Sequence, residues 1–515
     1  MEEASPETAL GGYAKALSAQ PFGSTAEIVT VEADITRGLH SFSIVGLPDK
    51  AVEEARDRLS GAIRHSGFKS PKSTNKKIIL SLSPADLKKE GSHFDVALAV
   101  CYLKAVGDLP NPADEHTLYI GELGLEGTLR KVRGVLPQVI AAKHAGITTV
   151  VVPLENALEA SLVRGLEILT PKTLSDLVLH ETGKVALAPY VRDDTPHPNT
   201  QKTVDMSEIK GQESAKRALE IAAAGRHNIV LYGPPGTGKT MLARALTSIL
   251  PPLTHEEMLE VTAIHSTAGT LVAGRPCFEA PFRAPHHTTS HTALVGGGAY
   301  PKAGEVTLAH KGILFLDEFP EFEARALEAL RQPLEDRVVT ISRARASITF
   351  PADCMLVAAM NPADTLSHDS DATLRAKRRQ EGKISRPIID RLDVWIEVPL
   401  VPPHILRDLH DGETSSAVRE RVMRAREQAH VRLNSDVRTN AHLTGKELDT
   451  LAQFSTESKD ALTSASKRLD LSPRAFHRTM RVARTIADLE GQEEVAVSHV
   501  LEALQYRPKG ILGIT

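Results

Sequence analysis

Short apolar runs alternate with helix-like stretches over the first part of the chain. Residues 77–82 (KIILSL) and 148–153 (TTVVVP) are rich in β-branched residues and therefore predict strands. Between them, residues 136–144 carry a helical pattern, and Gly146 supplies a stop signal just beyond it. This alternation predicts an α+β domain over residues 1–188.

A proline-containing stretch follows this domain. Residues 189–203 read PYVRDDTPHPNTQKT, with three prolines and little apolar content, which predicts a linker over residues 189–204. Residues 205–405 form a second segment, punctuated near its end by prolines at 399, 402 and 403. Residues 406–515 have helical patterns throughout. We therefore expect an α/β protein with a helical C-terminal domain.

A glycine-rich stretch lies between an apolar strand and a helical pattern. The apolar run covers residues 228–232, and the helical pattern covers 241–250. The residues between them fit the P-loop pattern GxxxxGK[ST], whose backbone N–H groups cradle phosphates at a helix N-terminus. We expect Lys239 to reach the β- and γ-phosphates of ATP and Thr240 to ligate Mg²⁺. The predicted nucleotide contacts here are Gly233, Pro234, Pro235, Gly236, Thr237, Gly238, Lys239, Thr240 and Met241.

Two further apolar runs end in polar residues. Asp317 and Glu318 follow the four apolar residues at 313–316, and Asn361 follows the run at 354–360. Such runs are typical of buried parallel strands, whose carboxyl ends hold ligands in α/β proteins. We expect Asp317 to hold the Mg²⁺ shell and Glu318 to orient the attacking water. Asn361 is expected to bond the γ-phosphate or that water, although an isolated Asn-Pro also signals a simple turn.

Several motifs together resemble one protein family. They are GPPGTGKT (233–240), FRAPHHTTSHTALVGGG (282–298), ILFLDEF (313–319) and AAMNP (358–362), with similar stretches at 45–68, 81–100, 121–137 and 471–491. With these motifs the chain resembles the magnesium-chelatase-like AAA+ ATPases and, within them, the ComM/YifB group. The resemblance covers nearly the whole chain.

The resemblance implies the architecture and further parts of the nucleotide site. It implies an AAA+ core at 205–405, a helical lid at 406–515 and a hexameric ring that binds ATP between subunits. Arg391 matches the arginine finger that reaches a neighbour's γ-phosphate, and Arg474 matches sensor 2 on the lid helix over the nucleotide. An ion pair of Arg391 with Asp390 or Asp393 is the alternative. The adenine contacts implied are Ile209, Gly211, Gln212, His227 and Asn228.

The N-terminal segment resembles the protease domain of Lon. In that register His93 stands at the nucleophile and Leu136 at the base, while Ser92 is one position early. A leucine accepts no proton, so the resemblance implies a proteolytically inactive structural or partner-binding domain. The contrary hypothesis requires Ser92 to use Lys88 or Lys89 as its base.

Composition excludes some classes of protein. The chain has 61 Lys and Arg against 65 Asp and Glu, a formal charge of −4, so it is no histone-like polycation. Aromatic residues make up 4% of the chain, which argues against recognition of bases by stacking. Its 3 cysteines are far apart, which excludes a disulfide framework and a four-cysteine zinc site. The acidic N-terminus and the absence of a long apolar run predict a cytosolic protein without a membrane span.

Basic residues gather locally despite the balanced sum. Arg343 and Arg345 lie between two strand-like runs at 338–341 and 347–350, which predicts a β-hairpin with a basic tip. In the family such a hairpin projects into the ring pore. The other predicted DNA contacts are Arg283, His286, His287, Lys377, Arg378 and Arg379. A solvated surface or intersubunit ion pairs are the alternative explanation of these charges.

These observations lead to a functional expectation. The resemblance implies an ATP-hydrolysing, Mg²⁺-dependent hexameric motor that drives branch migration of DNA beside RecA-type strand exchange in natural transformation. Phosphate contacts rather than base recognition would then dominate DNA binding. One alternative is a magnesium-chelatase motor subunit that powers metal insertion or protein remodelling. Another is a non-enzymatic or protease-type adaptor.

Overall fold

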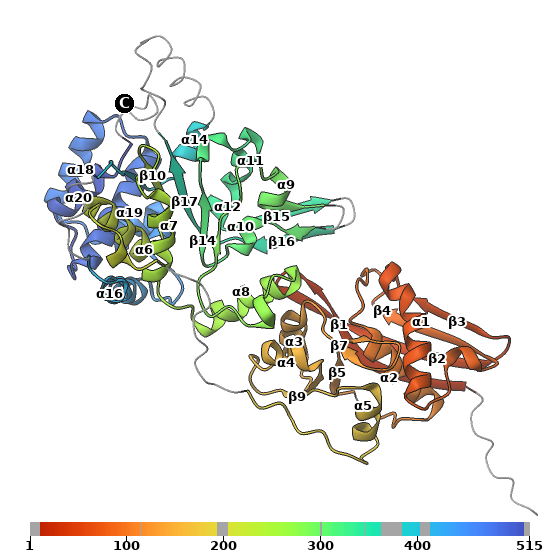
Figure 1. The fold of residues 1–515 in the computed structure, drawn as a ribbon. Helices are drawn as coiled ribbons and strands as arrows, with labels where there is room; N and C mark the ends of the chain where they lie inside the picture. Colours follow the sequence, from red (N-terminus) through yellow and green to blue (C-terminus); the bar gives the residue numbers. More distant parts are fainter. Residues whose placement is uncertain are drawn as a thin grey trace, which may run out of the picture. The chain divides into compact units, whose positions relative to one another are not determined.

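A computed structural model describes most of the chain: residues 11–113, 115–192, 204–298, 301–343, 346–361, 384–401 and 412–508. The chain divides into two compact units (Figure 1). The N-terminal unit comprises residues 1–197 and 255–277, and the P-loop unit comprises residues 198–254 and 278–515. None of the helices in the ranges given above is both long and apolar enough to cross a membrane.

A seven-stranded sheet forms the centre of the N-terminal unit. Its strands, in spatial order, are β3 (Ser41–Val45), β4 (Lys76–Ser83), β2 (Thr25–Arg37), β1 (Gly11–Phe22), β5 (Thr117–Tyr119), β8 (Thr149–Val151) and β9 (Glu167–Leu169). A short hairpin of β6 (Glu122–Leu123) and β7 (Leu129–Arg130) accompanies it. The strands predicted at 77–82 and 148–153 are confirmed as β4 and β8.

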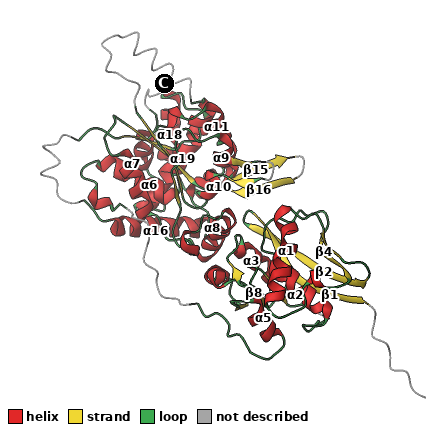
Figure 2. Cartoon of the chain, turned by 45° about the vertical axis from the view of Figure 1, so that its right-hand side comes forward, coloured by secondary structure: helices red, strands yellow, loops and turns green. Residues whose placement is uncertain are grey.

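Helices cover this sheet. They are α1 (Lys50–His65), α2 (Asp95–Val106), α3 (Val135–His144), α4 (Ala157–Ala160) and α5 (Leu174–Glu181). Figure 2 shows α1 and α2 beside β1 and β2, and the four elements share one apolar core because β2 alternates buried and exposed positions. The predicted helix at 136–144 is confirmed as α3.

A helix from later in the sequence belongs to the same unit. Helix α8 (His255–Ala268) lies within the range expected for the ATPase core, yet it packs against α3. The backbone N–H of Gly134 donates to the carbonyl of Ser266 at 3.1 Å. The Ser266 hydroxyl donates to the buried Glu159 carboxylate at 2.6 Å. The N-terminal unit is thus built from two separate stretches of the chain.

The P-loop unit is built on a five-stranded parallel sheet. Its spatial order is β11 (Phe282–Arg283), β14 (Ile313–Leu316), β17 (Met355–Met360), β10 (Ile229–Tyr232) and β18 (Val394–Glu397). Every residue of β14 and β17 is buried, which explains their continuous apolar sequence. Successive residues of β14 alternate between two cores, so both faces of the sheet are covered.

Helices lie on both sides of this sheet (Figure 1). One core contains α6 (Glu213–Gly225), α7 (Lys239–Ile249), α16 (Ser415–Leu433) and α19 (Pro473–Leu489). The other contains α9 (His291–Val295), α10 (Glu305–Leu308), α11 (Ala324–Ala329) and α14 (Arg386–Ile389), beside the short α12 (Arg331–Asp336). The C-terminal helices therefore share a continuous core with the helix that follows the P-loop.

The C-terminal helices and the predicted hairpin match the sequence pattern, whereas a third group, a small pair of strands, was not predicted. The helical C-terminal segment is completed by α17 (Gly445–Leu451), α18 (Thr456–Arg468) and α20 (Val497–Gln505). The predicted hairpin is confirmed as β15 (Val338–Arg343) and β16 (Ala346–Pro351), paired antiparallel with Arg343 opposite Ala346. A smaller pair is formed by β12 (Gly296–Gly297) and β13 (Lys302–Ala303).

Candidate nucleotide site

The P-loop joins the carboxyl end of β10 to the start of α7. Gly236 and Gly238 have φ values of 80° and 89°, a region that side-chain-bearing residues seldom adopt. Gly233 is also required, because a Cβ at this position would lie 2.2 Å from the carbonyl oxygen of Val398. Thr237 donates to the carbonyl of Pro234 at 3.0 Å. These constraints fold the loop around the N-terminus of α7, where a phosphate is favoured.

The Lys239 ammonium group is held inside this loop. It donates to the carbonyl oxygens of Gly233 and Pro234, at 2.7 Å each. Burial lowers the pKa of Lys239, and the nearby Asp317 carboxylate acts in the opposite direction. The amino group is therefore held inside the loop by bonds to neutral carbonyls, which a phosphate oxygen can replace.

The proposed Mg²⁺ ligands meet from two neighbouring elements. The Thr240 hydroxyl on α7 donates to the Asp317 carboxylate after β14 at 3.0 Å. A hydroxyl and a carboxylate oxygen this close form the hard oxygen donor set that Mg²⁺ prefers when phosphate completes its shell. Asp317 also accepts the backbone N–H of Glu318 at 2.9 Å, which orients the carboxylate. The residues present therefore fit a Mg²⁺–nucleotide complex.

Glu318 adopts an unusual backbone conformation and has a histidine partner. Its φ is 51° and its ψ is 44°, a left-handed conformation that is costly for a residue with a side chain. Its carboxylate lies 2.8 Å from Nδ1 of His287, and the Glu318 side chain is 52% exposed. The predicted water-orienting carboxylate is therefore open to solvent and touched by a residue that the sequence had suggested as a DNA contact.

Asn361 stands immediately after β17, next to the P-loop strand. The register pairs Tyr232 with Met360, and the backbone N–H of Gly233 donates to the carbonyl of Met360 at 3.2 Å. The carboxyl ends of β10, β14 and β17 therefore bring together the P-loop, the acidic pair and Asn361. This is the convergence that the three strand ends predict.

The segment expected at the adenine edge lies on the same side of the sheet. Gly211 and Gln212 both have positive φ and lead into α6. The Gln212 side chain donates to the carbonyl of Pro399 at 2.6 Å. Pro399 follows Val398, whose backbone bonds Tyr232 beside the P-loop. Ile209 is buried in the core next to this turn.

His227 and Asn228 lie at the other end of β10, which corrects their assignment to the adenine pocket. The strand is four residues long, so its two ends are separated by roughly 13 Å. His227 is buried with its Nε2 2.8 Å from the Thr485 hydroxyl. Asn228 accepts the backbone N–H of Leu356 and donates to the carbonyl of Arg391. Both side chains join strands and helices, and neither faces the P-loop.

The two proposed catalytic arginines meet at one carboxylate. Arg391 forms an ion pair with Glu335 and is 7% exposed. Arg474 lies 3.5 Å from the other oxygen of the same Glu335. Arg391 thus has an ion pair within the chain, but its partner is neither Asp390 nor Asp393. Asp393 instead pairs with Arg478 and lies near His227, and the positive groups around it hold its pKa well below the usual range.

The remaining predicted DNA contacts have different outcomes. Arg283 is engaged by Glu305 through two bonds of 2.7 and 2.9 Å, so its guanidinium is satisfied within the chain. The His286 ring lies tilted against that of His287, with centroids 4.1 Å apart, and it contacts the Thr288 hydroxyl at 2.9 Å. Arg343 ends β15 at the hairpin turn. Arg345, Lys377, Arg378 and Arg379 lie outside the described residues.

The region compared with Lon in the sequence places a carboxylate beside Ser92. The Ser92 hydroxyl donates to Glu122, while the Lys89 ammonium donates to the carbonyl of Pro84. His93 is buried with Nε2 2.9 Å from the carbonyl of Ala19, and burial lowers its pKa to about 4. Leu136 is fully buried. Ser92 and Lys89 are therefore bonded to other groups and do not form a serine–lysine pair.

Motif reasoning missed Glu335 altogether and missed the position of His287 beside Glu318. Glu335 carries no motif, and only the fold brings it to Arg391 and Arg474. His287 was noticed, but as a DNA contact and not as the partner of Glu318. The one signal that could have found it is its position just beyond β11, which lies beside β14 in the sheet.

Comparisons with known proteins agree with this architecture. Family models described as "Magnesium chelatase, subunit ChlI", "Subunit ChlI of Mg-chelatase" and "Magnesium chelatase, subunit ChlI C-terminal" match residues 205–406, 31–156 and 412–507. The "Competence protein ComM" of Haemophilus influenzae is 43% identical, over 94% of this chain and 95% of the relative.

Two further relatives differ in how much of the chain they cover. The "Uncharacterized protein YifB" of Escherichia coli is 42% identical, over 94% of this chain and 95% of the relative. The "Magnesium-chelatase 67 kDa subunit" of Chlorobaculum parvum is 27% identical, over 39% of this chain and 27% of the relative. The first similarity therefore extends over both units, whereas the second covers a smaller part.

Proposed function

This chain belongs to the ComM/YifB group of magnesium-chelatase-like AAA+ proteins, and from that premise we propose that it is an ATP-driven motor that moves on DNA. The finer proposal is a cytoplasmic hexameric ring that drives branch migration of joint DNA molecules and works beside a RecA-type strand-exchange protein. The observation that carries it is the meeting of Lys239, Thr240, Asp317 and Glu318 at one edge of the sheet.

The site residues divide the work of ATP hydrolysis. Bound ATP with Mg²⁺ supplies the transferable phosphoryl group and neutralises part of its charge. Lys239 exchanges its two carbonyl partners for phosphate oxygens, and Thr240 and Asp317 provide the metal's protein ligands. Glu318 accepts hydrogen bonds from the attacking water and orients it, which requires that its carboxylate leave His287. Asn361 fixes the same water or the γ-phosphate from the neighbouring strand end.

Arg391 and Arg474 are proposed to act on a neighbouring subunit's nucleotide. Both arginines contact Glu335 and therefore lie close together in the folded chain. We propose that Arg474, like the arginine finger Arg391, reaches the nucleotide of the neighbouring subunit. Arg391 is 7% exposed and its Nε lacks a hydrogen-bond partner in the described part of the chain. An arginine supplied in trans to the phosphates is worth about 10³–10⁵ in rate where this has been measured in GTPases.

The hairpin of β15 and β16 is the proposed DNA-gripping element. Arg343 ends β15 at its turn, and six copies in a ring would gather these arginines around one channel. Arg283 is no longer proposed as a DNA contact, because its guanidinium forms an ion pair with Glu305. Contacts to phosphates specify position and not sequence, so the motor is expected to act on DNA with little sequence preference.

Branch migration on a synthetic three-way junction tests the proposal. We compare the wild-type chain with Glu318→Gln, which keeps the size of the side chain and removes its charge. The matched control is Glu323→Gln, which removes one charge from an exposed residue at the start of α11 that makes no cap hydrogen bond.

The wild type and Glu323→Gln are expected to resolve the junction with ATP and Mg²⁺. Glu318→Gln is expected to bind ATP and assemble, with an ATPase rate lower by about 10²–10⁴ and no branch migration. Absence of any DNA-stimulated ATPase in the wild type would exclude the DNA motor. Equal branch migration by Glu318→Gln would exclude the assigned role of Glu318.

A second candidate is a magnesium-chelatase motor subunit or a protein-remodelling ATPase. The observation that favours it is the family description and the partial similarity to the chelatase subunit of Chlorobaculum parvum. The full-length similarity to ComM and YifB favours the DNA motor instead. ATPase activity stimulated by the other chelatase subunits with a porphyrin, and unaffected by DNA, would select this second candidate.

A further inference from the structure

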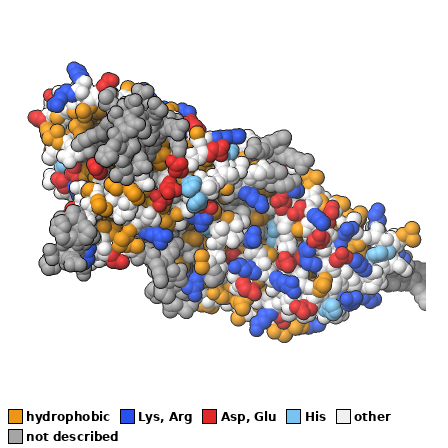
Figure 3. All heavy atoms as spheres, turned by 45° about the horizontal axis from the view of Figure 1, so that its top comes forward, with side chains coloured by type: hydrophobic (Ala, Val, Ile, Leu, Met, Phe, Trp, Pro, Cys, Tyr) orange, Lys and Arg blue, Asp and Glu red, His pale blue; other side chains and the backbone are white. Residues whose placement is uncertain are grey.

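One surface of the N-terminal unit carries an excess of positive charge that the proposed motor does not use. Residues 64–77 read RHSGFKSPKSTNKK, with five Lys or Arg residues and no acidic residue. Figure 3 shows acidic and basic side chains interspersed over the visible face of this unit, so a patch of one sign departs from the general pattern. All five basic side chains are exposed.

The sheet places one further cation, Arg37, beside this segment. The register of β2 and β4 places Arg37 directly opposite Lys76, and that of β3 and β4 places Ser41 opposite Lys77. Directly opposed side chains have Cβ atoms about 5 Å apart, and like charges in such a pair are destabilising. An arrangement with an intrinsic cost of this kind is typical of a surface that meets an anion.

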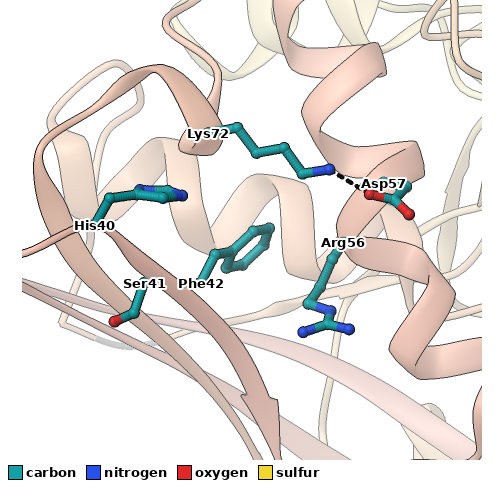
Figure 4. A pocket seen from close by; sticks show the side chains of 6 residues that line it. All are labelled: His40, Ser41, Phe42, Arg56, Asp57 and Lys72. Carbon is teal, nitrogen blue, oxygen red and sulfur yellow. Dashed lines mark hydrogen bonds and ion pairs between the residues drawn. The ribbon is translucent and has the colours of Figure 1, made fainter.

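A hollow borders these strand ends. It has a volume of about 530 Å³ and lies between β3, α1 and the turn before β4 (Figure 4). Figure 4 shows the Lys72 side chain reaching across to Asp57, with the Phe42 ring below the Lys72 side chain and the Arg56 side chain below the ion pair. Lys72 and Asp57 form an ion pair that lowers the pKa of Asp57. His40 and Ser41 line the opposite wall.

Most of these cations have no acidic partner. We call Arg37, His40, Arg56, Lys69, Lys72, Lys76 and Lys77 the β4 basic surface. Within the described residues, Lys72 is the member of this surface that forms an ion pair, and Arg56 donates through Nε to the backbone carbonyl of Glu53 at 3.2 Å. Arg37, Lys76 and Lys77 make no ion pair there. Their charges are therefore available to a ligand.

The layout fits a repeating anion better than a single phosphate. A site for one phosphate brings its donors together around one point, often with backbone N–H groups. Here the cations are spread over a strand end, a turn and a helix. Lys72 is paired with Asp57, whose carboxylate also interacts with Arg56, whereas Arg37, Lys69, Lys76 and Lys77 are exposed and make no ion pair within the described residues. A polymer with regularly spaced phosphates can neutralise each of them separately.

We propose that the β4 basic surface binds the phosphodiester backbone of DNA, so that the N-terminal unit gives the motor a second DNA contact outside the AAA+ ring. The choice of DNA as the polyanion rests on the proposed function. The half-buried Phe42 is the aromatic residue of the hollow, so recognition is by charge and independent of sequence.

The test is DNA binding by the full chain as a function of salt. The test variant is Arg37→Gln/Lys76→Gln/Lys77→Gln. The control variant is Arg164→Gln/Lys143→Gln/Lys184→Gln, which removes one arginine and two lysines from other exposed positions of the same unit. Fluorescence anisotropy with labelled duplex and forked DNA is measured with a non-hydrolysable ATP analogue, and basal ATPase and melting temperature are determined for each variant.

The expected result separates the two triple variants. The slope of log affinity against log salt is expected to become shallower by about 0.9 for each duplex phosphate that the test variant no longer neutralises. The control variant keeps the wild-type slope. Basal ATPase is expected to be the same in all three proteins, because none of these residues contacts the nucleotide site. A retained melting temperature shows that the unit is folded.

Other outcomes contradict the inference in distinguishable ways. If the wild type binds DNA and the test variant has the same slope and affinity, the second DNA-binding surface does not exist while the motor proposal stands. If inorganic phosphate displaces the DNA at matched ionic strength, the surface binds a single phosphate, and the proposal of a polyanionic ligand is wrong. If the wild type does not bind DNA, this inference falls together with the proposed function.

Discussion

The two units treat their charged residues in opposite ways. At the nucleotide site of the P-loop unit, Lys239 and Glu318 are held by partners that a ligand can replace, namely backbone carbonyls and the half-buried His287. Around the start of α2 in the N-terminal unit, Asp95 and His93 are buried and have internal partners. A polar group is ready for chemistry when its partners are exchangeable, whatever motif it stands in.

The buried centre shows how firmly such groups can be held. Asp95 lies 2.7 Å from Arg58 and accepts the backbone N–H of Leu123 at 3.2 Å. Burial raises the pKa of Asp95 to about 6, against the opposing effect of Arg58. These contacts join α1, α2 and β6, so Asp95 serves the fold. The same region in an active serine–lysine enzyme would need an exposed hydroxyl beside a neutral amine.

The largest effect is expected from the P-loop lysine. Lys239→Ala removes the cation that meets the phosphates, and ATP hydrolysis is expected to fall by at least about 10². The matched control is Lys210→Ala, an exposed lysine on the neighbouring turn before α6, which should leave the rate unchanged. Steady-state ATPase assays measure both. Similar rates in the two variants would remove the distinction drawn between the two units.

The next effect is the pH dependence of stability that arises from two buried residues of the N-terminal unit, His93 and Asp95. The folded-state pKa of His93 is lowered from 6.5 to about 4, so His93 makes the free energy of unfolding rise with pH over that range. The folded-state pKa of Asp95 is raised from 3.8 to about 6, so Asp95 makes the free energy of unfolding fall as pH rises over that range. In the wild type the two slopes largely offset each other.

Single substitutions should uncover each slope. Asp95→Asn should leave a stability that increases between about pH 4 and pH 6.5, and His93→Gln one that decreases between about pH 4 and pH 6, each by up to roughly 3 kcal/mol. Hydrogen exchange at the amides of α2, corrected for the intrinsic effect of pH, reports this unit specifically. Flat profiles in both variants would show that these groups are not buried as described.

A smaller effect is expected from the partner of Glu318. His287→Ala frees the Glu318 carboxylate and is expected to raise ATPase activity without DNA by no more than about fivefold, because a partly exposed pair is worth about 1 kcal/mol or less. His286→Ala, which removes the adjacent ring, is the control. DNA stimulation should shrink in His287→Ala by the same factor. A loss of activity in His287→Ala would instead assign His287 a direct role in catalysis.

The smallest effect tests the opposed cations of the β4 basic surface. Lys76→Thr removes the repulsion with Arg37 and is expected to stabilise the N-terminal unit by about 0.5 kcal/mol. Lys77→Thr lies on the same strand opposite Thr36 and Ser41, so it lacks that gain and serves as the control. Urea unfolding followed by circular dichroism measures the difference. Equal stabilities would mean that Arg37 and Lys76 avoid each other by pointing apart.

Contiguous residues suffice to locate much of this protein. The P-loop, the apolar strands before Asp317 and Asn361, the helical C-terminal segment and the β15–β16 hairpin all follow from short local patterns. They do so because backbone conformation and strand burial depend mainly on neighbours in sequence, on glycine and on the period of apolar residues. The resemblance to the magnesium-chelatase-like group adds the family, which the comparisons confirm.

The partners of the polar side chains come only from the tertiary structure. Glu335 meets Arg391 and Arg474 across 56 and 139 residues of sequence, and His287 reaches Glu318 from beyond a neighbouring strand. Helix α8 packs on α3 and not on its neighbours in sequence. His227 lies at the start of β10, whereas the P-loop follows the end of that strand. Such pairings depend on strand order, register and burial, which bring together residues that no local pattern relates.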